Sequence, residues 1–241
     1  MLDNPFEDYI SPDLSITNGE IDGSFITISW QADNLFALEF SHILEPAEME
    51  WSDWKSSTTT SYGNLNEGEY NFIIKSRYEE GNEQETPDSL SFVIDAIEGP
   101  GLRFFPLFQQ EKYPEAISIE IYAEEVTDLI GAEIEFTYDP NIAVLDTSAF
   151  TMGSLFSSTQ GQPQLIKEYN LETGYVLLTL ATALDDTGLT DSGSLVELQF
   201  IPQTTGAFEL SFSNACVYVK NTAPNTAISF ISLTSGNVMI K

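Results

Sequence analysis

Residues that perform chemistry are scarce in this sequence. Among 241 residues it has one cysteine, Cys216, and one histidine, His42. A single cysteine excludes an intrachain disulfide, and a single histidine without further cysteines excludes the usual zinc site. No Gly-x-Ser-x-Gly elbow exists in which His42 would serve a serine nucleophile. The sequence therefore predicts no enzyme and no cofactor.

Basic residues and long hydrophobic runs are also few. The chain has 8 Lys and Arg against 38 Asp and Glu, for a formal net charge of −30. A surface this negative repels phosphate backbones, so we expect neither nucleic acid nor an anionic membrane as partner. No run approaches the ~20 apolar residues of a membrane span, and no basic-then-apolar leader opens the chain. The charge suits basic partners, divalent cations or a salty medium.

Helical periodicity is missing as well. Turn residues recur about every ten residues, with strand-like runs between them. This spacing predicts an all-β protein of the sandwich type. The best candidate for a domain boundary is the Gly-Pro-Gly segment within residues 97–101. Apolar and polar residues do not alternate there as they would in a strand. We therefore predict two β-sandwich domains, over residues 1–98 and 99–241.

Each predicted domain has its own set of strands. In residues 1–98 the strand-like runs are 14–16, 25–30, 35–43, 51–55, 58–62, 68–78 and 89–94. About seven short strands in under ~100 residues is the size of an immunoglobulin-like or fibronectin type III sandwich. In residues 99–241 the runs are 102–106, 116–123, those before and after Tyr138-Asp139-Pro140, 164–169, 174–183, 194–202, 206–212, 215–219 and 236–240. About ten strands with a long middle loop fit a jelly-roll sandwich.

The segment 126–140 gives the clearest strand pattern. Its side chains alternate, with Ile134, Phe136 and Tyr138 on one side and Glu133, Glu135 and Thr137 on the other. Alternation with a period of two predicts a half-buried antiparallel strand. Asp139-Pro140 ends the strand, because proline lacks a ladder N–H and biases the preceding residue toward extended geometry.

The strand 174–183 has two rows that are both partly apolar, so its outward row is less polar than a solvated face. In the next strand Val196, Leu198 and Phe200 form the row expected in the core, and we expect Leu195 to point outward. The predicted outward binding set combines carboxylates with apolar side chains. Its members are Glu133, Glu135, Thr137, Tyr175, Leu177 and Thr179.

Residues 99–241 resemble the cohesin domains, which are receptor modules that bind dockerins. The resemblance rests on the strand that runs into Tyr138-Asp139-Pro140, on the Gly153-Ser154-Leu155 turn, and on the order of later segments at 183–188, 192–200, 210–215 and 236–240. It implies a non-catalytic module, extracellular or at the cell surface, that recruits a dockerin-bearing partner such as a secreted hydrolase to a scaffold.

The resemblance also implies where the partner binds. In cohesins a sheet face of mixed apolar and polar character grips a dockerin helix, and Glu133 stands where the family often has an acidic or amide contact. Gly131 departs from the family pattern, because other members carry a polar side chain there.

Residues 1–98 are similar to fibronectin type III modules and to their Tyr-rich immunoglobulin-like variant. The similarity is carried by Trp51-Ser52-Asp53-Trp54 and by residues 65–72 and 77–82. It implies a sandwich that serves as a spacer. Trp51 and Trp54 have a second interpretation, as an aromatic platform for a sugar, although such pairs more often pack on a strand. For the whole chain, the alternative function is an adhesion or carbohydrate-binding module that keeps the cohesin-like fold, with a polysaccharide as candidate ligand and no dockerin partner.

The acidic segment 184–192 is the candidate for a metal site. It holds Asp185, Asp186 and Asp191, with oxygen-bearing side chains between them. Calcium takes about six to eight oxygen ligands, and this segment does not supply them, so we predict a solvated turn. Paired carboxylates also serve glycosidases, but neighbours such as Asp185 and Asp186 seldom face one cleft. The twelve-residue calcium loop of a dockerin is absent, which places the chain on the receptor side of the pair.

Overall fold

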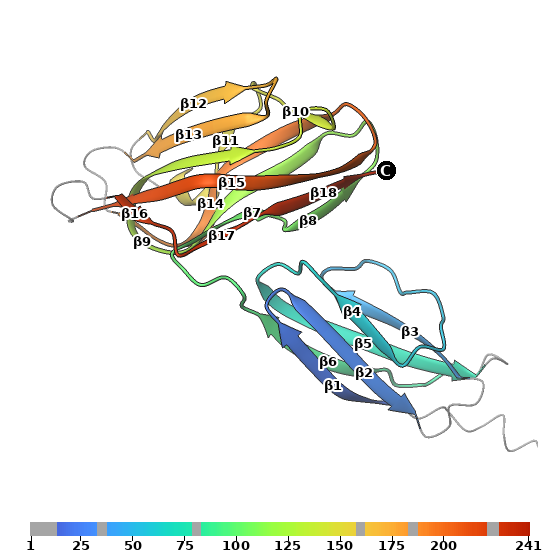
Figure 1. Cartoon of the computed structure of the whole chain (residues 1–241). Helices are drawn as coiled ribbons and strands as arrows, with labels where there is room; N and C mark the ends of the chain where they lie inside the picture. Colours follow the sequence, from blue (N-terminus) through green and yellow to red (C-terminus); the bar gives the residue numbers. More distant parts are fainter. Residues whose placement is uncertain (1–13, 33–37, 79–82, 158–161, 183–187, 221–226) are drawn as a thin grey trace, which may run out of the picture. The chain divides into compact units, whose positions relative to one another are not determined.

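The structure, a computed structural model, describes residues 14–32, 38–78, 83–157, 162–182, 188–220 and 227–241 (Figure 1). The chain forms two compact units, Met1–Ala96 (unit 1) and Ile97–Lys241 (unit 2). The predicted boundary, between residues 98 and 99, lies two residues beyond this division. Almost all described elements are strands, which confirms the all-β fold class. No helix within these ranges is long and apolar enough to cross a membrane.

Unit 1 is a sandwich of two antiparallel three-stranded sheets. One sheet has the order β1 (Leu14–Asp22), β2 (Phe25–Ala32) and β4 (Thr59–Tyr62), and the other has the order β3 (Leu38–Glu45), β5 (Gly68–Tyr78) and β6 (Asp88–Ile94). Alternation along β2 and β5 sends Ile28 and Phe72 inward, where both are fully buried. Side chains from both sheets join one core, so unit 1 packs as two layers.

Residues 51–55 do not form the strand that the sequence predicts. Among them only Lys55 makes a bridge, with Phe40 of β3. The ladder is interrupted at Ser52, whose hydroxyl oxygen accepts the His42 N–H at 3.0 Å, while the Ser52 N–H donates to the His42 carbonyl at 2.8 Å. A side-chain oxygen thus takes the place of a backbone acceptor, and regular pairing does not propagate along the segment.

Unit 2 is a jelly-roll sandwich whose two sheets share two long strands. Sheet 1 has the order β12 (Gln164–Asn170), β13 (Tyr175–Ala181), the last part of β9 (Ile117–Thr137), the last part of β15 (Gly206–Val219) and β16 (Ala227–Ser229). Sheet 2 pairs the first part of β9 with β7 (Gly101–Phe105) and β14 (Leu189–Pro202), and β14 with β10 (Ala143–Leu145) and β11 (Thr151–Met152).

The remaining elements complete sheet 2 and its edge. β17 (Ser232–Thr234) pairs with β7 in parallel, and β18 (Gly236–Ile240) lies between the first part of β15 and β8 (Phe108–Glu111). A single helical turn, α1 (Ser154–Ser157), follows β11 where the sequence predicts a turn and no helix.

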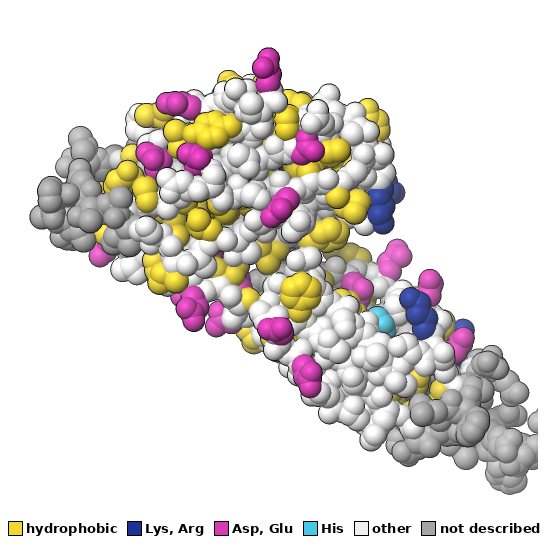
Figure 2. Space-filling model, in the orientation of Figure 1, with side chains coloured by type: hydrophobic (Ala, Val, Ile, Leu, Met, Phe, Trp, Pro, Cys, Tyr) yellow, Lys and Arg dark blue, Asp and Glu magenta, His cyan; other side chains and the backbone are white. Residues whose placement is uncertain are grey.

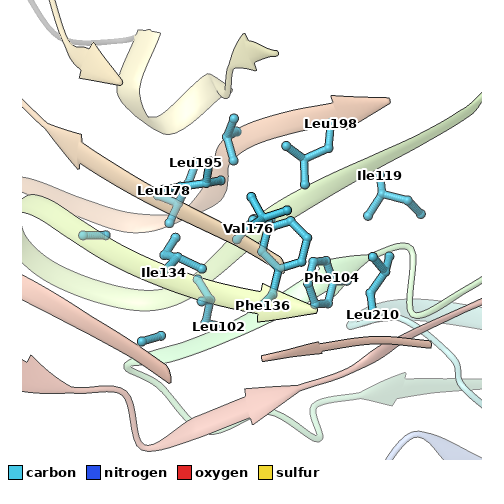
Figure 3. Packing of buried hydrophobic residues seen from close by; sticks show 14 of the residues in the cluster. Leu102, Phe104, Ile119, Ile134, Phe136, Val176, Leu178, Leu195, Leu198 and Leu210 are labelled. Carbon is cyan, nitrogen blue, oxygen red and sulfur yellow. The ribbon is translucent and has the colours of Figure 1, made fainter. Parts of the chain in front are cut away.

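The two sheets of unit 2 enclose one hydrophobic core (Figure 3). Phe136 of sheet 1 and Phe104 of sheet 2 meet there in edge-to-face geometry, with ring centroids 5.4 Å apart. Leu178 and Leu198 are also fully buried in this core. Because sheet 1 buries one face against sheet 2, its opposite face forms part of the surface of unit 2.

β9 is one element where the sequence predicts two strands. Residues 117–129 pair with β14 in sheet 2, and residues 131–137 pair with β13 in sheet 1. Glu125 and Asp128 mark the crossing with positive φ values of 50° and 53°. Hydroxyl oxygens replace ladder acceptors there, since the Glu125 N–H donates to Ser192 Oγ and the Asp128 N–H donates to Thr190 Oγ1. Because of these hydrogen bonds to side chains, the strand passes from one sheet to the other without leaving the two backbone N–H groups unpaired.

Leu195 is fully buried, so the prediction that it points outward is wrong. The register between β14 and β9 shifts between Ser194 and Val196. At such an irregularity successive side chains need not alternate between the two sides of the sheet. Leu195 and Val196 therefore both enter the core.

The Tyr138-Asp139-Pro140 motif ends β9 through local contacts. The Asn141 N–H donates to Asp139 Oδ1 at 2.9 Å, which closes an Asx turn. Tyr138 turns into the core, where its Oη accepts the Leu145 N–H at 3.3 Å. Burial raises the pKa of the Tyr138 phenol, and this hydrogen bond opposes the shift. The motif thus has a structural role in joining β9 to β10.

Candidate binding face

The outward face of sheet 1 is built from β12, β13 and the parts of β9 and β15 that belong to this sheet. Directly opposed residues of antiparallel strands point to the same side. One row across the sheet places Leu177 between Glu168 of β12 and Glu135 of β9. The next row contains Ile166, Thr179, Glu133 and Cys216. We call this surface the sheet 1 face.

All six predicted partner-binding residues lie on the sheet 1 face, in two adjacent strands. Thr137, Glu135 and Glu133 of β9 stand opposite Tyr175, Leu177 and Thr179 of β13, respectively. Thr137 is exposed and the others are half-buried. The intervening residues, Ile134, Phe136, Val176 and Leu178, are fully buried. The structure therefore brings the predicted set together, and its role in binding stays a prediction.

Glu135 is held in place from both neighbouring strands. Tyr175 Oη donates to its Oε2 at 3.2 Å, and Ser213 Oγ donates to its Oε1 at 2.6 Å. Loss of hydration, followed by the adjacent Glu135 carboxylate, raises the pKa of the Tyr175 phenol, which keeps this donor protonated. A carboxylate has about four acceptor positions, so Glu135 can still accept hydrogen bonds from a partner.

Sequence reasoning missed the residues that β12 and β15 add to the sheet 1 face. Glu168 and Ile166 come from β12, and Ile166 is 59% exposed. Tyr218 and Cys216 come from β15, which pairs with the other side of β9. The short connection between the predicted runs 164–169 and 174–183 could have revealed the β12 residues. A short loop indicates a hairpin, and a tight hairpin fixes which residues of its two strands are paired.

The β12–β13 turn shows how that register is set. Asn170 Oδ1 accepts the N–H groups of Glu172 at 3.0 Å and Thr173 at 3.3 Å. Gly174 follows with φ of 71°, a conformation that glycine adopts without steric cost. The turn therefore pairs Asn170 with Tyr175 and, along the hairpin, Glu168 with Leu177.

Gly131 lies on the sheet 1 face between β13 and Tyr218. A Cβ atom at this position would lie 2.7 Å from the Leu180 carbonyl oxygen, and 3.7 Å from the Tyr218 ring. Close approach of the backbone therefore explains the absence of the polar side chain that the family resemblance leads one to expect. The neighbouring Tyr218 forms a hydrogen bond with the Cys216 thiol, which is the main cause of the raised pKa of its phenol.

The sheet 1 face is acidic. Its carboxylates are Glu133, Glu135 and Glu168, and none of its described positions holds Lys or Arg. Figure 2, in the same orientation as Figure 1, shows acidic and hydrophobic side chains interspersed over unit 2. The face thus offers apolar area and hydrogen-bond acceptors to a partner.

The metal candidates gain no support from the described part of the chain. Asp185 and Asp186 lie outside the described residues. Asp191 is exposed in β14, and its Oδ1 accepts the Ser192 N–H at 2.8 Å. Within the described ranges, no group of three or more His, Cys, Asp or Glu side chains is arranged to hold a metal ion.

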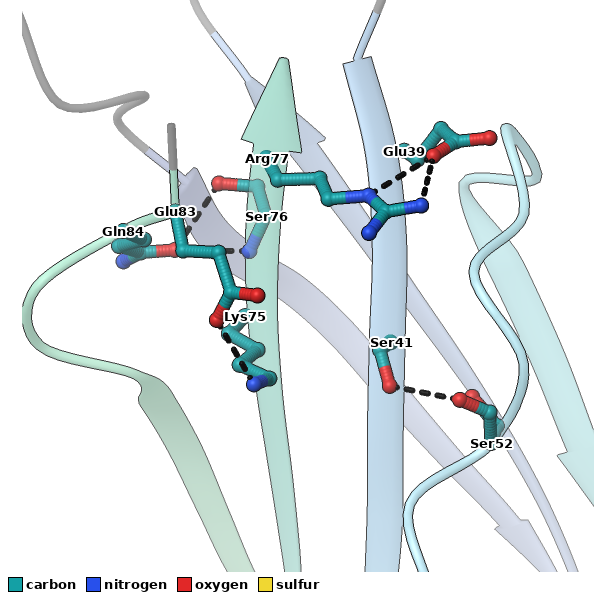
Figure 4. A network of polar contacts seen from close by, with 8 residues as sticks. All are labelled: Glu39, Ser41, Ser52, Lys75, Ser76, Arg77, Glu83 and Gln84. Carbon is teal, nitrogen blue, oxygen red and sulfur yellow. Dashed lines mark hydrogen bonds and ion pairs between the residues drawn. The ribbon is translucent and has the colours of Figure 1, made fainter. Parts of the chain in front are cut away.

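Trp51 and Trp54 of unit 1 pack against cations. Lys75 Nζ lies 4.9 Å from the Trp51 ring centroid and 5.1 Å from that of Trp54, and the Arg77 guanidinium lies 4.3 Å from the Trp54 centroid. Ion pairs hold both cations, Lys75 with Glu83 at 2.9 Å and Arg77 with Glu39 at 2.7 Å (Figure 4). These cations occupy ring surface that a sugar platform would present to its ligand.

His42 lies among aromatic rings in unit 1. Its ring centroid is 5.3 Å from that of Phe72, and its Nδ1 is 2.9 Å from Tyr62 Oη. Tyr62 Oη in turn donates to Glu48 Oε2 at 3.2 Å. Burial is the largest effect on His42 and lowers its pKa, with Glu48 acting in the opposite direction. These contacts give the residue a packing role in β3.

No protein-family model matches this sequence, and no curated protein sequence matches it. Among solved structures the chain is similar to a type II cohesin domain from the cellulosome of Acetivibrio cellulolyticus, with 14% identity, a TM-score of 0.49, and coverage of 58% of this chain and 96% of that one. It is also similar to a non-cellulosomal cohesin from the archaeon Archaeoglobus fulgidus, with 12% identity, a TM-score of 0.46, and coverage of 58% and 90%.

A third similar structure is a type I cohesin–dockerin complex from Clostridium thermocellum. The identity is 9%, the TM-score is 0.49, and the match covers 58% of this chain and 98% of the other.

Proposed function

We propose that unit 2 is a non-catalytic, cohesin-like module whose sheet 1 face binds a dockerin-bearing protein. The observation that carries the proposal is the row in which half-buried Leu177 lies between Glu135 and Glu168. An apolar centre with a polar border is the composition of a protein–protein interface. The sequence resemblance around Tyr138-Asp139-Pro140 supports dockerins as the partner class.

The same resemblance supports a cellular location and a role for the module. It is an extracellular or cell-surface component that recruits its partner, such as a secreted hydrolase, to a scaffold, and unit 1 acts as a spacer. The small number of His and Cys residues, one of each, supports a binding role over a catalytic one.

The test is calorimetric titration of the whole chain with a panel of dockerins, comparing the parent with Leu177→Ala. Truncation of a central apolar anchor typically costs about 1–4 kcal/mol of binding. We expect the dissociation constant to rise about tenfold or more, which corresponds to roughly 1.4 kcal/mol per decade. Because Leu177 is on the outward side of β13, the melting temperature should stay nearly unchanged.

Ile201→Ala is the matched control, because Ile201 is an apolar residue of β14 that is 45% exposed and lies outside the sheet 1 face. It should bind as the parent does. Calcium chelation should abolish binding through the dockerin, whose fold depends on that ion. If no dockerin binds, or if Leu177→Ala binds as tightly as the parent, the proposal is wrong.

The alternative is an adhesion or carbohydrate-binding module with the cohesin-like fold and no dockerin partner, for which the Trp51–Trp54 pair of unit 1 is a candidate sugar platform. The cations packed on these rings reduce the surface open to a sugar. A glycan array with the parent and Trp51→Ala separates the two functions. Saturable glycan binding that is lost in Trp51→Ala, without binding to any dockerin, would favour the alternative.

A further inference from the structure

Like charges on the sheet 1 face are close together and uncompensated. Glu133 and Glu135 are two residues apart on β9, and Glu168 is on the same row as Glu135, two strands away. Within the described residues none of the three forms an ion pair. The chain as a whole has a formal charge of −30, so the rest of the molecule does not offset them. A basic partner relieves this repulsion, whereas an acidic partner adds to it.

The spacing of the carboxylates matches the repeat of a helix. Residues two apart on a strand are about 6.7 Å apart along its axis, and one turn of an α-helix rises about 5.4 Å. Basic side chains one turn apart on a helix that lies along β9 can therefore reach Glu133 and Glu135. Their long, flexible stems accommodate the remaining difference.

Leu177 supplies the apolar part of the expected contact with a partner helix. It is opposite Glu135 on the neighbouring strand, about 4.8 Å away, and Glu168 borders it on the far side. An apolar residue of the same helix, on the side that faces β13, would pack on Leu177. Glu135 is already oriented by Tyr175 and Ser213, so it loses little freedom on binding.

On the basis of the proposed function, we infer that the partner of this face is a cationic amphipathic helix. It presents two or more Lys or Arg residues about one turn apart, flanking an apolar residue, and Glu133, Glu135 and Glu168 select it by charge. Dockerins whose contacting helix is neutral or acidic bind weakly or not at all.

The first experiment compares two variants of equal net charge. One is the triple variant Glu133→Gln, Glu135→Gln and Glu168→Gln on the sheet 1 face. The control is Glu50→Gln, Glu98→Gln and Glu115→Gln, three exposed glutamates outside that face. Calorimetry with a basic-helix dockerin should show about a tenfold or greater loss of affinity for the face variant and less than about a threefold loss for the control.

Salt provides the second measurement. Raising sodium chloride from about 0.05 M to about 0.5 M shortens the screening length severalfold, so the parent should lose about tenfold in affinity, and the face variant much less. If a dockerin binds the parent, but with no salt dependence and with equal affinity for the face variant, the inference is overturned while the proposed function stands.

If no dockerin binds, a pair of designed helical peptides tests the inference of a cationic helix separately from the proposed dockerin binding. One peptide is amphipathic with leucine and lysine, and the other is its leucine and glutamate counterpart. If the lysine peptide binds the parent and the control variant but not the face variant, the proposed function fails and the inference stands. If it binds all three chains alike, or binds none of them, the inference is overturned.

Discussion

Ser213 Oγ lies 2.6 Å from Glu135 Oε1, and a β-bulge places it there. The register between β15 and β9 shifts between Phe212 and Asn214, so Ser213 is the extra residue on β15. A bulge re-aims a side chain that strict pairing would send elsewhere. Together with Tyr175 on the opposite strand, Ser213 fixes the carboxylate at the centre of the sheet 1 face.

We predict that Tyr175→Phe weakens partner binding without unfolding the domain. The change removes one of two donors to Glu135, and a partly buried hydrogen bond typically contributes about 1 kcal/mol to stability. The dissociation constant should rise by about threefold, because the carboxylate is less well oriented. Tyr169→Phe is the control, since Tyr169 is exposed on the other side of β12. Equal affinities for the two variants would show that Tyr175 does not position Glu135.

We predict that Gly174→Ala destabilises unit 2 by about 2–4 kcal/mol. Gly174 has φ of 71°, and a Cβ there would lie 2.0 Å from the Tyr138 carbonyl oxygen, a backbone atom. The change should also disturb the hydrogen bond from the Tyr138 N–H to the Gly174 carbonyl. Chemical denaturation measures the loss, and Glu172→Ala in the same turn should leave stability nearly unchanged. A loss below about 0.5 kcal/mol would contradict the steric argument.

We predict strong coupling between Arg103 and Glu124. Their side chains are 4% and 9% exposed, and Arg103 Nε lies 2.6 Å from Glu124 Oε1. Removing one member of a buried pair leaves the other charge uncompensated, so Arg103→Met should cost about 3–5 kcal/mol. The double variant Arg103→Met, Glu124→Leu should cost clearly less than the sum of the single changes. An additive result in this double-mutant cycle would mean that the two side chains do not interact in the folded state.

We predict that His42 makes the stability of unit 1 depend on pH. Burial lowers its pKa in the folded state below the unfolded value of about 6.5. The unfolded chain then binds more protons, so stability is fully present above pH ~6.5 and is lost as the pH falls through the folded-state pKa. Thermal unfolding followed from pH ~7.5 to pH ~6, where carboxylates stay ionised, measures the slope. His42→Phe keeps an aromatic ring at this position but removes the titratable imidazole, so the pH dependence of stability should flatten. An unchanged slope would exclude His42 as its source.

Much of the sheet 1 face was predictable because alternation is a local property. Backbone geometry alone sends Ile134 and Phe136 to one side of β9 and Glu133 and Glu135 to the other, whatever the strand pairs with. The same rule failed at Leu195, where a register shift breaks the alternation. It also failed at residues 51–55, where the Ser52 hydroxyl takes the place of a backbone acceptor.

The all-β class, and the side of the sheet on which each β9 and β13 residue lies, follow from the amino-acid pattern alone. Packing of the whole domain sets which strands are neighbours, and hence brings Glu168 and Ser213 to Glu135 on one surface. It also decides that β9 crosses from one sheet to the other at Glu125 and Asp128. The physical reason is range: side-chain alternation follows from neighbouring dihedral angles, whereas strand order and register depend on contacts between residues as far apart as Glu135 and Ser213.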